Sequence, residues 1–376
     1  MNLFSKIVNE IKKNFKIFKD INSINKKKPK FIFYSEDKSY LKYGYLLIEY
    51  LSNKYPGEVY YISSDIDDGI SNLNVKNIFI GKDFFLKYFF LNVRADNVFI
   101  TLTDLNNSII IRNKFVKNYI YYFHGAISTT KAYTATAFDN YDTILCNGDY
   151  QYIEIKKREK LENLKEKKLI KLGYCYFDYL NNKINKNNYG NEILVAPSWN
   201  KNKIKFINED FEKIIENIIK AGFIVRFRPH PETIKRSNNL INFYKNKFKG
   251  ENFIFDDKPD NFDAMQKAKC LITDNSGISI EYIMIFKKPV IYYNDFDKIH
   301  NDKFDKYKDL KTMDEIVKEK FGYSLEKNQI NEIKKIINFA VNEFNNQEID
   351  YFINNNFYNF KKTINYFKDN ISKICI

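Results

Sequence analysis

Residues 225–232 (VRFRPHPE) combine side chains that bind phosphate. An apolar run leads into an Arg-Pro-His-Pro turn, in which Arg228 and His230 supply charge and directed hydrogen bonds. The prolines on both sides of His230 fix their own φ angles and restrict the residues that precede them, so a stiff turn presents the imidazole. Donors held in this way suit an anionic ligand such as a pyrophosphate.

A second phosphate-binding pattern lies in residues 273–281 (TDNSGISIE). Here an apolar run enters a turn of small residues that opens a helix. The N-terminus of a helix presents backbone N–H groups and the positive end of the helix dipole, and the hydroxyl groups of Ser276 and Ser279 add donors. If the two segments meet at one sheet edge, they predict a pyrophosphate site.

Arginine is scarce in this lysine-rich chain: of 61 basic residues, only six are Arg. An arginine in such a context indicates that a planar, bidentate fork was needed, and phosphate is a frequent partner of that fork. Two of the six, Arg226 and Arg228, lie beside His230. We expect Arg228 to contact phosphate, whereas Arg226 is better explained as an ordinary surface charge on an edge strand.

Short apolar runs alternate with helical patterns along most of the chain, which predicts two doubly wound α/β domains with mostly parallel sheets. The expected strands of the first domain are 30–34, 58–62, 77–80, 97–102, 118–123 and 143–146, with helices at 40–53, 82–91 and 133–138. The expected strands of the second are 192–197, 223–227, 253–255, 270–273 and 289–293, with helices at 209–221, 232–248, 261–268 and 278–286.

The length of 376 residues fits two such domains. A Lys/Asn-rich passage at 181–191 is the expected linker, and residues 325–376 read as helical. We predict an amphipathic basic helix over 1–27, an N-terminal Rossmann-like domain over 28–187 and a C-terminal Rossmann-like domain over 188–350. Residues 351–376 are expected to form a C-terminal helix that could cross back to the first domain. Ligands of open α/β sheets bind at the carboxyl ends of strands, so a cleft between the domains is the expected site.

The N-terminal segment carries apolar residues at helical spacing with lysines on much of the other face. Such a helix could lie on an anionic membrane leaflet or pack on its own domain. No apolar run approaches the ~20 residues needed to span a bilayer, and no signal peptide with a cleavage site is visible. We therefore expect a cytoplasmic protein, which the N-terminal helix could attach to the inner face of the membrane.

The bulk charge favours an anionic partner, since the formal net charge is +14. Lysines spread along the chain do not distinguish nucleic acid, an acidic membrane or a phosphorylated substrate. The four cysteines form no CxxC pair and have no neighbouring His, so they read as reduced structural thiols. Neither a metal site nor a bound cofactor is expected.

His124 and Gly125 form a third motif that could take part in chemistry, because they follow the apolar run 118–123. A histidine at the carboxyl end of a strand can take a proton from an incoming hydroxyl near neutral pH, and Gly125 allows close approach of a ligand. The alternative is a core histidine with satisfied hydrogen bonds. His300, the third histidine, lies in a polar loop and is expected to be solvated.

Taken in order, His124-Gly125, the turn 228–231, the segment 273–281 and Lys288-Pro289-Val290 resemble the CDP-glycerol:glycerophosphate glycerophosphotransferase family of teichoic-acid and capsule polymerases. The resemblance covers residues 118–295. It implies a GT-B fold, in which two Rossmann-like domains face each other across a cleft, with the acceptor domain at 28–187 and the nucleotide-donor domain at 188–350. It also implies transfer of an alditol phosphate from a CDP-alditol to a saccharide or lipid-linked acceptor, with release of CMP.

The resemblance also implies site roles. His124 would be the general base, and His230 with Arg228 would contact the donor pyrophosphate and stabilise charge on the phosphoryl group. The remaining donor-binding residues would be Asp274, Ser276, Gly277, Ser279 and Glu281, and the candidate acceptor-binding residues are Gly125 and Lys131. Catalysis would rest on positioning and electrostatics.

This chain departs from the family pattern. Ser276-Gly277 stands where a Ser-Ser pair is common, Glu281 where Asp is common, and Ala126 begins a continuation that lacks the usual Thr-Pro residues. The alternatives are a GT-B glycosyltransferase that uses a nucleotide sugar in capsule or lipopolysaccharide synthesis, and a nucleotide-sugar 2-epimerase with a similar donor loop. A nucleic-acid-binding protein would explain the charge but not the gathering of small and charged residues at strand ends, so no nucleic-acid partner is expected.

Overall fold

The computed structural model describes residues 3–185, 190–199, 207, 209–293 and 299–376. Within these ranges the chain divides into two compact units. Unit 1 comprises residues 1–124, 136–179 and 357–376, and unit 2 comprises residues 125–135 and 180–356. The segment 125–135, which we expected in the first domain, groups with unit 2. Residues 186–189 of the expected linker lie outside the described ranges.

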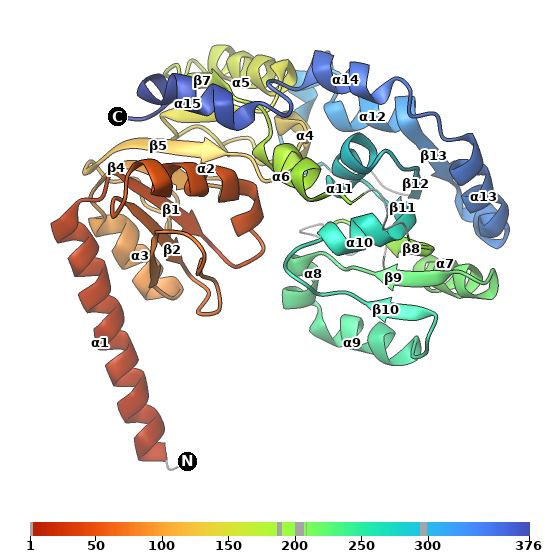
Figure 1. Ribbon diagram of the computed structural model, residues 1–376, viewed down its shortest axis with the longest axis horizontal. Coiled ribbons are helices and arrows are strands. Elements are labelled where there is room, and N and C mark those ends of the chain that lie inside the picture. The colour runs from red at the N-terminus through yellow and green to blue at the C-terminus, as the bar shows by residue number, and fades with distance from the viewer. Residues whose placement is uncertain (1–2, 186–189, 200–206, 208, 294–298) are drawn as a thin grey trace. The chain divides into compact units, whose positions relative to one another are not determined.

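Unit 1 contains a seven-stranded parallel sheet (Figure 1). Its strands are, in spatial order, β3 (Lys76–Phe79), β2 (Val59–Ser63), β1 (Phe31–Ser35), β4 (Ala95–Ile100), β5 (Val116–Tyr122), β6 (Thr143–Cys146) and β7 (Lys168–Lys171). Its helices are α1 (Leu3–Lys27), α2 (Leu41–Lys54), α3 (Asp83–Asn92), α5 (Asp149–Leu161), α15 (Thr363–Ile374) and the first part of α6 (Cys175–Lys183).

Unit 2 contains a six-stranded parallel sheet. Its strands are, in spatial order, β10 (Phe253–Phe255), β9 (Ile224–Phe227), β8 (Glu192–Val195), β11 (Ala268–Thr273), β12 (Val290–Tyr293) and β13 (Gly322–Leu325). Its helices are α4 (Thr129–Ala132), α7 (Glu209–Lys220), α8 (Pro231–Arg236), α9 (Asn238–Lys247), α10 (Phe262–Lys267), α11 (Ile278–Glu281), the π-helix η1 (Tyr282–Phe286), the 3-10 helices η2 (Phe304–Tyr307) and η3 (Lys327–Glu332), α12 (Met313–Phe321), α13 (Ile333–Glu343) and α14 (Ile349–Asn356).

Both sheets have the strand order of a Rossmann fold. The second and third strands of each unit lie in order on one side of its first strand. The later strands lie in order on the other side. The order reverses between β1 and β4 in unit 1 and between β8 and β11 in unit 2. The expected doubly wound α/β class is therefore confirmed, and each reversal is the point at which such sheets bind ligands.

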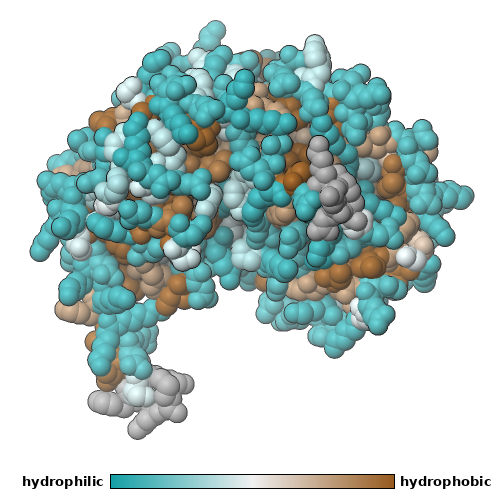
Figure 2. Space-filling model, in the orientation of Figure 1, coloured by the Kyte–Doolittle hydropathy of each residue, from teal (hydrophilic) through white to brown (hydrophobic). Residues whose placement is uncertain are grey.

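Helix α1 has two differently exposed parts. Ile17, Ile21 and Ile24 are buried, and the ring of Phe18 lies against rings of α3 at centroid distances of 5.0–6.0 Å. Nearer the N-terminus, Ile11 and Phe15 are 62% and 71% exposed. Figure 2 shows apolar side chains beside hydrophilic ones on this projecting part. Residues 1 and 2 of the predicted helix, and the side chains of Leu3, Phe4 and Ile7, lie outside what the structure describes.

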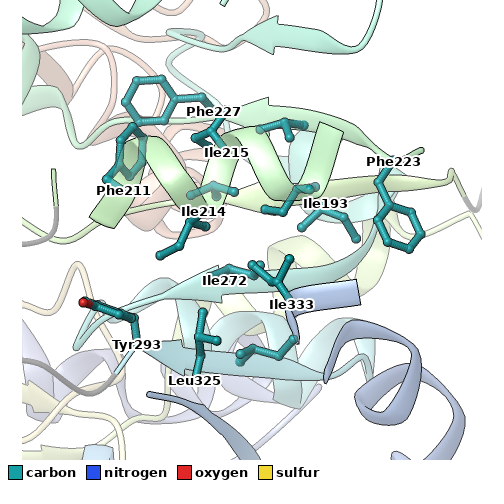
Figure 3. Close-up of a cluster of buried hydrophobic side chains, with 14 of the residues drawn as sticks. Ile193, Phe211, Ile214, Ile215, Phe223, Phe227, Ile272, Tyr293, Leu325 and Ile333 are labelled. Carbon is teal, nitrogen blue, oxygen red and sulfur yellow. The ribbon is translucent and has the colours of Figure 1, made fainter. Parts of the chain in front are cut away.

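Helix α7 shows how periodicity builds the core of unit 2. Phe211, Ile214, Ile215 and Ile218 recur at i, i+3, i+4 and i+7, and all are fully buried. They pack on one face of the sheet against residues such as Ile193, Phe227 and Ile272 (Figure 3). The central strands β8, β9, β11 and β12 are largely buried, which explains their nearly continuous apolar sequences.

The last twenty residues are tied to unit 1 by hydrogen bonds from its sheet. Asn97 donates to the Ile376 carbonyl and accepts from the Ile376 N–H, at 2.9 and 3.0 Å. Asn118 donates to the Ile374 carbonyl at 3.0 Å. The buried carboxylate of Asp178 accepts from the backbone N–H groups of Lys361 and Thr363. These bonds satisfy buried polar groups, so the C-terminal segment is part of unit 1.

Four predicted helices differ from the structure. The C-terminal helix predicted over 351–376 is divided between α14, which ends at Asn356, and α15, which begins at Thr363. Residues 133–138 form turns, because Asp104 accepts from the Thr136 hydroxyl and its own N–H donates to the Ala137 carbonyl. The helix predicted over 232–248 is broken at Ser237 into α8 and α9. The helix predicted over 278–286 begins as α11 and widens into the π-helix η1.

Gly173 is predicted to be intolerant of any side chain. It has a φ of +99°, and a Cβ there would overlap the carbonyl oxygen of Tyr358 in the C-terminal segment. Gly57 has a similar φ of +79° with open space around it. Gly57→Ala should cost about 1 kcal/mol of unfolding free energy from the backbone strain alone, and Gly173→Ala should cost about 4 kcal/mol or more. Equal urea midpoints for the two variants would contradict this packing.

Candidate functional site

Three loops of unit 2 meet at the reversal of strand order. The chain continues from β8 to Ser198 and Trp199, from β9 to the turn at 228–231, and from β11 to the turn at 274–277. The backbone N–H of Arg228 donates to Val195 at the end of β8, and the N–H of Ala196 donates to Ile272 of β11. The two phosphate-binding patterns predicted from the sequence therefore flank β8 at one edge of one sheet.

Asp274 links the loops after β8 and β11. Its buried carboxylate accepts from the backbone N–H of Ser198 and from the Ser198 hydroxyl, both at 2.7 Å. A carboxylate that receives two such bonds holds the backbone of both loops in place. The side chain predicted to bind the donor directly is thus engaged within the protein, where it fixes the position of Ser198.

The segment Ser276–Ser279, called the serine turn below, has the expected form of a helix start. Ser279 donates from its backbone N–H and from its hydroxyl to the Ser276 carbonyl, at 3.1 and 2.8 Å. Ser276 and Gly277 are half-buried, whereas Ser279 and Glu281 are buried. A Cβ at Gly277 would lie 3.2 Å from Ile127, so glycine allows the segment 125–135 to pack on this turn. The Ser-Gly sequence in place of Ser-Ser thus has a packing reason.

His230 caps helix α8, and Pro231 follows it in the first turn. Its Nδ1 accepts from the backbone N–H of Glu232 at 3.1 Å. In the neutral ring the proton therefore lies on Nε2, which is oriented as a hydrogen-bond donor. The ring lies nearly parallel to Trp199 at a centroid distance of 6.4 Å and an interplanar angle of 28°. Cap and ring contact together fix the orientation of the half-buried imidazole.

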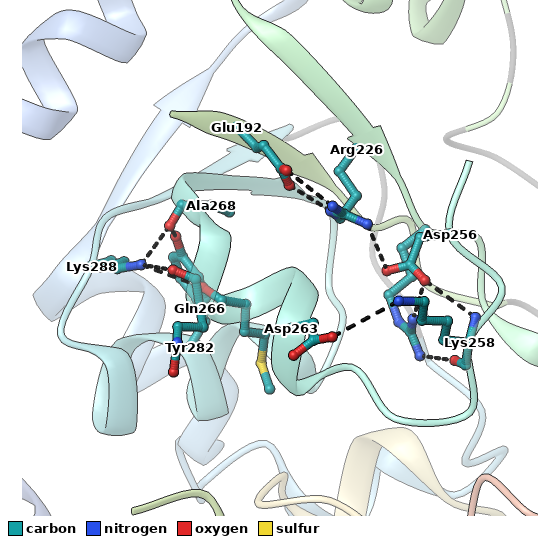
Figure 4. Close-up of polar contacts among 11 residues, drawn as sticks. Glu192, Arg226, Asp256, Lys258, Asp263, Gln266, Ala268, Tyr282 and Lys288 are labelled. Carbon is teal, nitrogen blue, oxygen red and sulfur yellow. Dashed lines mark hydrogen bonds and ion pairs between the residues drawn. The ribbon is translucent and has the colours of Figure 1, made fainter. Parts of the chain in front are cut away.

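The two arginines beside His230 form ion pairs in unit 2 (Figure 4). Arg226 makes a bidentate pair with Glu192 at 2.5 and 3.0 Å and lies 3.7 Å from Asp256. The surface-charge interpretation of Arg226 is wrong, because its side chain is only 8% exposed. Arg228 pairs with the other oxygen of Asp256 at 3.1 Å and donates to the Lys258 carbonyl at 2.6 Å.

The segment 125–135, which carries both candidate acceptor residues, is attached to unit 2. Ser128 accepts from the Met313 N–H at 2.7 Å, and Asn301 donates to the Thr130 carbonyl at 2.8 Å. Lys131 pairs with Glu315 at 2.9 Å and is 13% exposed. Burial raises the pKa of Glu315, but hydrogen bonds from Lys131 and Thr312 outweigh burial and lower it below its usual value. Gly125 is buried at the start of this segment.

His124 belongs to unit 1, where it follows β5. Its half-buried ring meets those of Tyr40 and Tyr43 edge-on, with centroid distances of 5.5 and 6.0 Å. Both tyrosines come from the loop after β1 and the start of α2, so they also lie at the carboxyl end of their sheet. Of the ten predicted site residues, His124 lies in unit 1 and the other nine lie in unit 2.

The comparisons with known proteins agree with this architecture. Residues 17–363 match the family model CDP-Glycerol:Poly(glycerophosphate) glycerophosphotransferase. The chain belongs to this family. No curated protein sequence matches the chain.

Similar solved structures include the wall teichoic acid polymerase TagF. One TagF variant has a TM-score of 0.62 and 18% identity over 99% of this chain and 98% of its own. A TagF variant soaked with CDPG has a TM-score of 0.61 and 16% identity over 97% of this chain and 98% of its own. The UDP-GlcNAc 2-epimerase of Methanocaldococcus jannaschii, in complex with UDP-GlcNAc and UDP, has a TM-score of 0.57 and 13% identity, over 92% of this chain and 99% of its own.

These likenesses, with the strand orders of both sheets, confirm the predicted GT-B fold. Family membership makes the chain a transferase of the CDP-glycerol glycerophosphotransferase type.

Lys288 of this glycerophosphotransferase has a structural role. It belongs to the motif 288–290. Its ammonium donates to the carbonyls of Gln266 and Ala268, both at 2.6 Å, at the end of α10 (Figure 4). Burial lowers its pKa to about 8. The lysine satisfies carbonyl groups that the helix end leaves without intrahelical donors.

Sequence reasoning missed Trp199. It is the only tryptophan of the chain and comes four residues after the end of β8, which are the signals that could have identified it. Besides His230, its ring meets His300 edge-on at 5.9 Å and the guanidinium of Arg236 at 5.5 Å. His300 is half-buried here, so its predicted place in a solvated loop is corrected.

The part of the chain that the structure describes holds no group of three or more His, Cys, Asp or Glu side chains arranged to bind a metal ion. The four cysteines are free and buried. Burial raises the pKa of all four thiols, that of Cys375 to about 12. They have the properties of structural thiols rather than of nucleophiles.

We predict that the Arg226–Glu192 pair supports the fold. Arg226→Met strands the nearly buried Glu192 carboxylate, so unfolding free energy should fall by about 3 kcal/mol. Replacing Glu192 by Met in the same protein removes the stranded charge, so the double variant should recover most of the loss. Urea denaturation of both single variants and the double variant measures the coupling. Additive losses would show that the pair contributes nothing.

Proposed function

We propose that this enzyme transfers glycerol phosphate, or a related alditol phosphate, from a CDP-alditol to an acceptor hydroxyl during synthesis of a capsule or teichoic-acid-like polymer. The acceptor oxygen forms a bond to the phosphorus that carries the alditol. The bond from that phosphorus to the bridging oxygen breaks, CMP leaves with the bridging oxygen, and the acceptor proton passes to a base. The family match over residues 17–363 supports this reaction.

The observation that carries the proposal is the connection of His230 to the serine turn through the loop after β8. Ser198 is bound to Asp274, immediately before that turn, and the adjacent Trp199 lies on His230. A diphosphate at this edge would accept from Nε2 of His230 and from the backbone N–H groups of Ser276, Gly277 and Ile278, since that of Ser279 donates to the Ser276 carbonyl. Phosphoryl transfer is driven mainly by such preorganised donors, which stabilise charge on the phosphoryl oxygens.

The proposed role of Arg228 is electrostatic. Its guanidinium is held by Asp256 and by the Lys258 carbonyl, only two positions from His230. A cation held in this way adds positive potential at the phosphate without having to reorganise. Glu281, buried at the end of α11, is the proposed contact to donor hydroxyls. For the other half of the reaction, we assign His124 as the base that takes the acceptor proton.

The alternatives fit less well. A glycosyltransferase using a nucleotide sugar and a nucleotide-sugar 2-epimerase share the GT-B fold and a diphosphate site. The family model, however, matches the length of the chain from residue 17 to residue 363 and describes phosphotransfer. Release of UDP, or epimerisation of a UDP-sugar, would favour these alternatives.

The two histidines are expected to affect different steps. His124→Ala removes the proton acceptor, so turnover should fall by about 10²–10⁴-fold while the Kd for CDP-glycerol changes little. His230→Ala removes a donor to the diphosphate, so it should weaken CDP-glycerol binding as well as turnover. Calorimetric titration with CDP-glycerol and an assay of CMP release measure the two effects, and each variant is the control for the other. Wild-type turnover in either variant would refute its assignment.

We also propose that helix α1 attaches the enzyme to an anionic membrane surface. The exposed Ile11 and Phe15 lie one turn apart, and Lys12, Lys16 and Lys19 form a neighbouring stripe of the helix. Exposed apolar side chains flanked by lysines suit the boundary between lipid headgroups and acyl chains. None of the helices in the described ranges is long and apolar enough to cross a bilayer. The proposed location is therefore cytoplasmic and peripheral.

Replacing Ile11 and Phe15 together by Ser should reduce sedimentation with vesicles that contain phosphatidylglycerol, because the change removes the inserting side chains. Phe339→Ser is the matched control, since Phe339 is 60% exposed on α13 of unit 2. Raising the salt concentration should weaken binding of the wild type by screening the lysines. Equal sedimentation of wild type, control and double variant would reject the membrane role of α1.

A further inference from the structure

His124 lies in a cluster of tyrosines that unit 1 builds at the carboxyl end of its sheet. Tyr40 and Tyr43 meet the imidazole edge-on. Tyr43 in turn meets Tyr176 edge-on at 4.9 Å and lies nearly parallel to Tyr174 at 6.5 Å. Tyr174 and Tyr176 come from the chain that follows β7 and are buried, whereas Tyr40 and Tyr43 are half-buried. Tyr174 and Tyr176 thus form the buried floor of the cluster, and Tyr40 and Tyr43 form its partly exposed rim.

Local hydrogen bonds fix this rim. The Asp37 carboxylate accepts from the Ser39 N–H at 2.9 Å, and the Asp37 carbonyl accepts from the Tyr40 N–H at 3.1 Å. Gly44 lets α2 approach the sheet, since a Cβ there would lie 2.9 Å from the hydroxyl of the buried Tyr122. The first turn of α2 is therefore held close to the end of β5, which brings Tyr43 beside His124.

A cation completes the cluster. The ammonium group of Lys42 lies 5.2 Å from the ring centroid of Tyr43 and 5.4 Å from that of Tyr176. Lys42 is half-buried, so two ring faces hold its charge at the rim. Tyrosine rings pack against the C–H groups of polyols, tyrosine hydroxyls can bond to polyol hydroxyls, and an ammonium group pairs with a phosphate.

We propose that this cluster is the acceptor subsite, and that it takes the hydroxyl-bearing end of an alditol phosphate chain. Lys42 pairs with the last phosphodiester of the acceptor, Tyr40 and Tyr43 contact its terminal alditol, and the terminal hydroxyl is presented to His124. The inference rests on the proposed function, in which His124 receives the acceptor proton. It adds that residues of unit 1 recognise the acceptor as an anion.

The test compares Lys42→Ala with Lys54→Ala. Lys54 lies at the other end of α2 and makes the same kind of contact, at 5.6 and 5.7 Å from the rings of Tyr50 and Tyr55. The probe is a synthetic di(glycerol phosphate) with a free terminal hydroxyl, and the comparison acceptor is an uncharged glycerol glucoside. Lys42→Ala should raise the KM for the charged acceptor about tenfold or more, with little change in kcat or in the Kd for CDP-glycerol. Lys54→Ala should change none of these.

Direct titration of di(glycerol phosphate) into the donor-free enzyme separates this inference from the function on which it rests. Binding that is weakened in Lys42→Ala but not in Lys54→Ala supports the subsite, even if CDP-glycerol proves to be the wrong donor. If the wild type releases CMP but both lysine variants have the same KM for the charged acceptor, the subsite assignment is overturned while the proposed function stands. An equal rise in KM for charged and uncharged acceptors in Lys42→Ala would also overturn it, because it would show only a packing role.

Discussion

The pair of hydrogen bonds from Ser198 to the Asp274 carboxylate is the contact on which the candidate donor site depends. Strand order reverses between β8 and β11, so the connections that leave these strands diverge, and the loops at their carboxyl ends separate. The buried Asp274 carboxylate holds the two loops together despite this divergence, through two hydrogen bonds of 2.7 Å from Ser198. Trp199 follows Ser198, and its ring lies nearly parallel to that of His230 at 6.4 Å, so the loop that Asp274 holds also carries the ring beside the imidazole.

The charges around this site show how a lysine-rich chain uses its few arginines. We applied the argument from scarcity to Arg228 and took Arg226 for a surface charge, but in the structure Arg226 has a partner that needs a planar fork. That partner is the Glu192 carboxylate, and Asp256 lies between the two guanidinium groups. Residue type alone does not distinguish phosphate from carboxylate, because both accept the same bidentate geometry.

Much of the fold was predictable because buried parallel strands are continuous apolar runs. Every strand predicted from such a run is confirmed, within a few residues at its ends. The edge strands β7 and β13 were missed because their sequences, KLIK and GYSL, keep exposed and polar residues. The turns at 133–138 were taken for a helix because their hydrogen bonds with Asp104, about thirty residues away, cannot be detected from the local sequence.

The candidate site was predictable to the level of its loops. Motifs at strand ends located the three loops that carry His124, His230 and Ser276. They did not predict the contacts that Asp274, Arg228 and Lys131 make within the protein, because these contacts depend on partners distant in sequence. Likewise, no pattern within 125–135 shows that this segment packs with unit 2, since its partners Asn301 and Met313 come 171 and 185 residues after the residues they contact.

A crystal structure of the enzyme with CDP-glycerol tests the central claim most directly. We expect one diphosphate oxygen about 3 Å from Nε2 of His230 and another that accepts from the backbone of the Ser276–Ser279 turn. A diphosphate bound elsewhere, with His230 and this turn both out of hydrogen-bonding range, would contradict it.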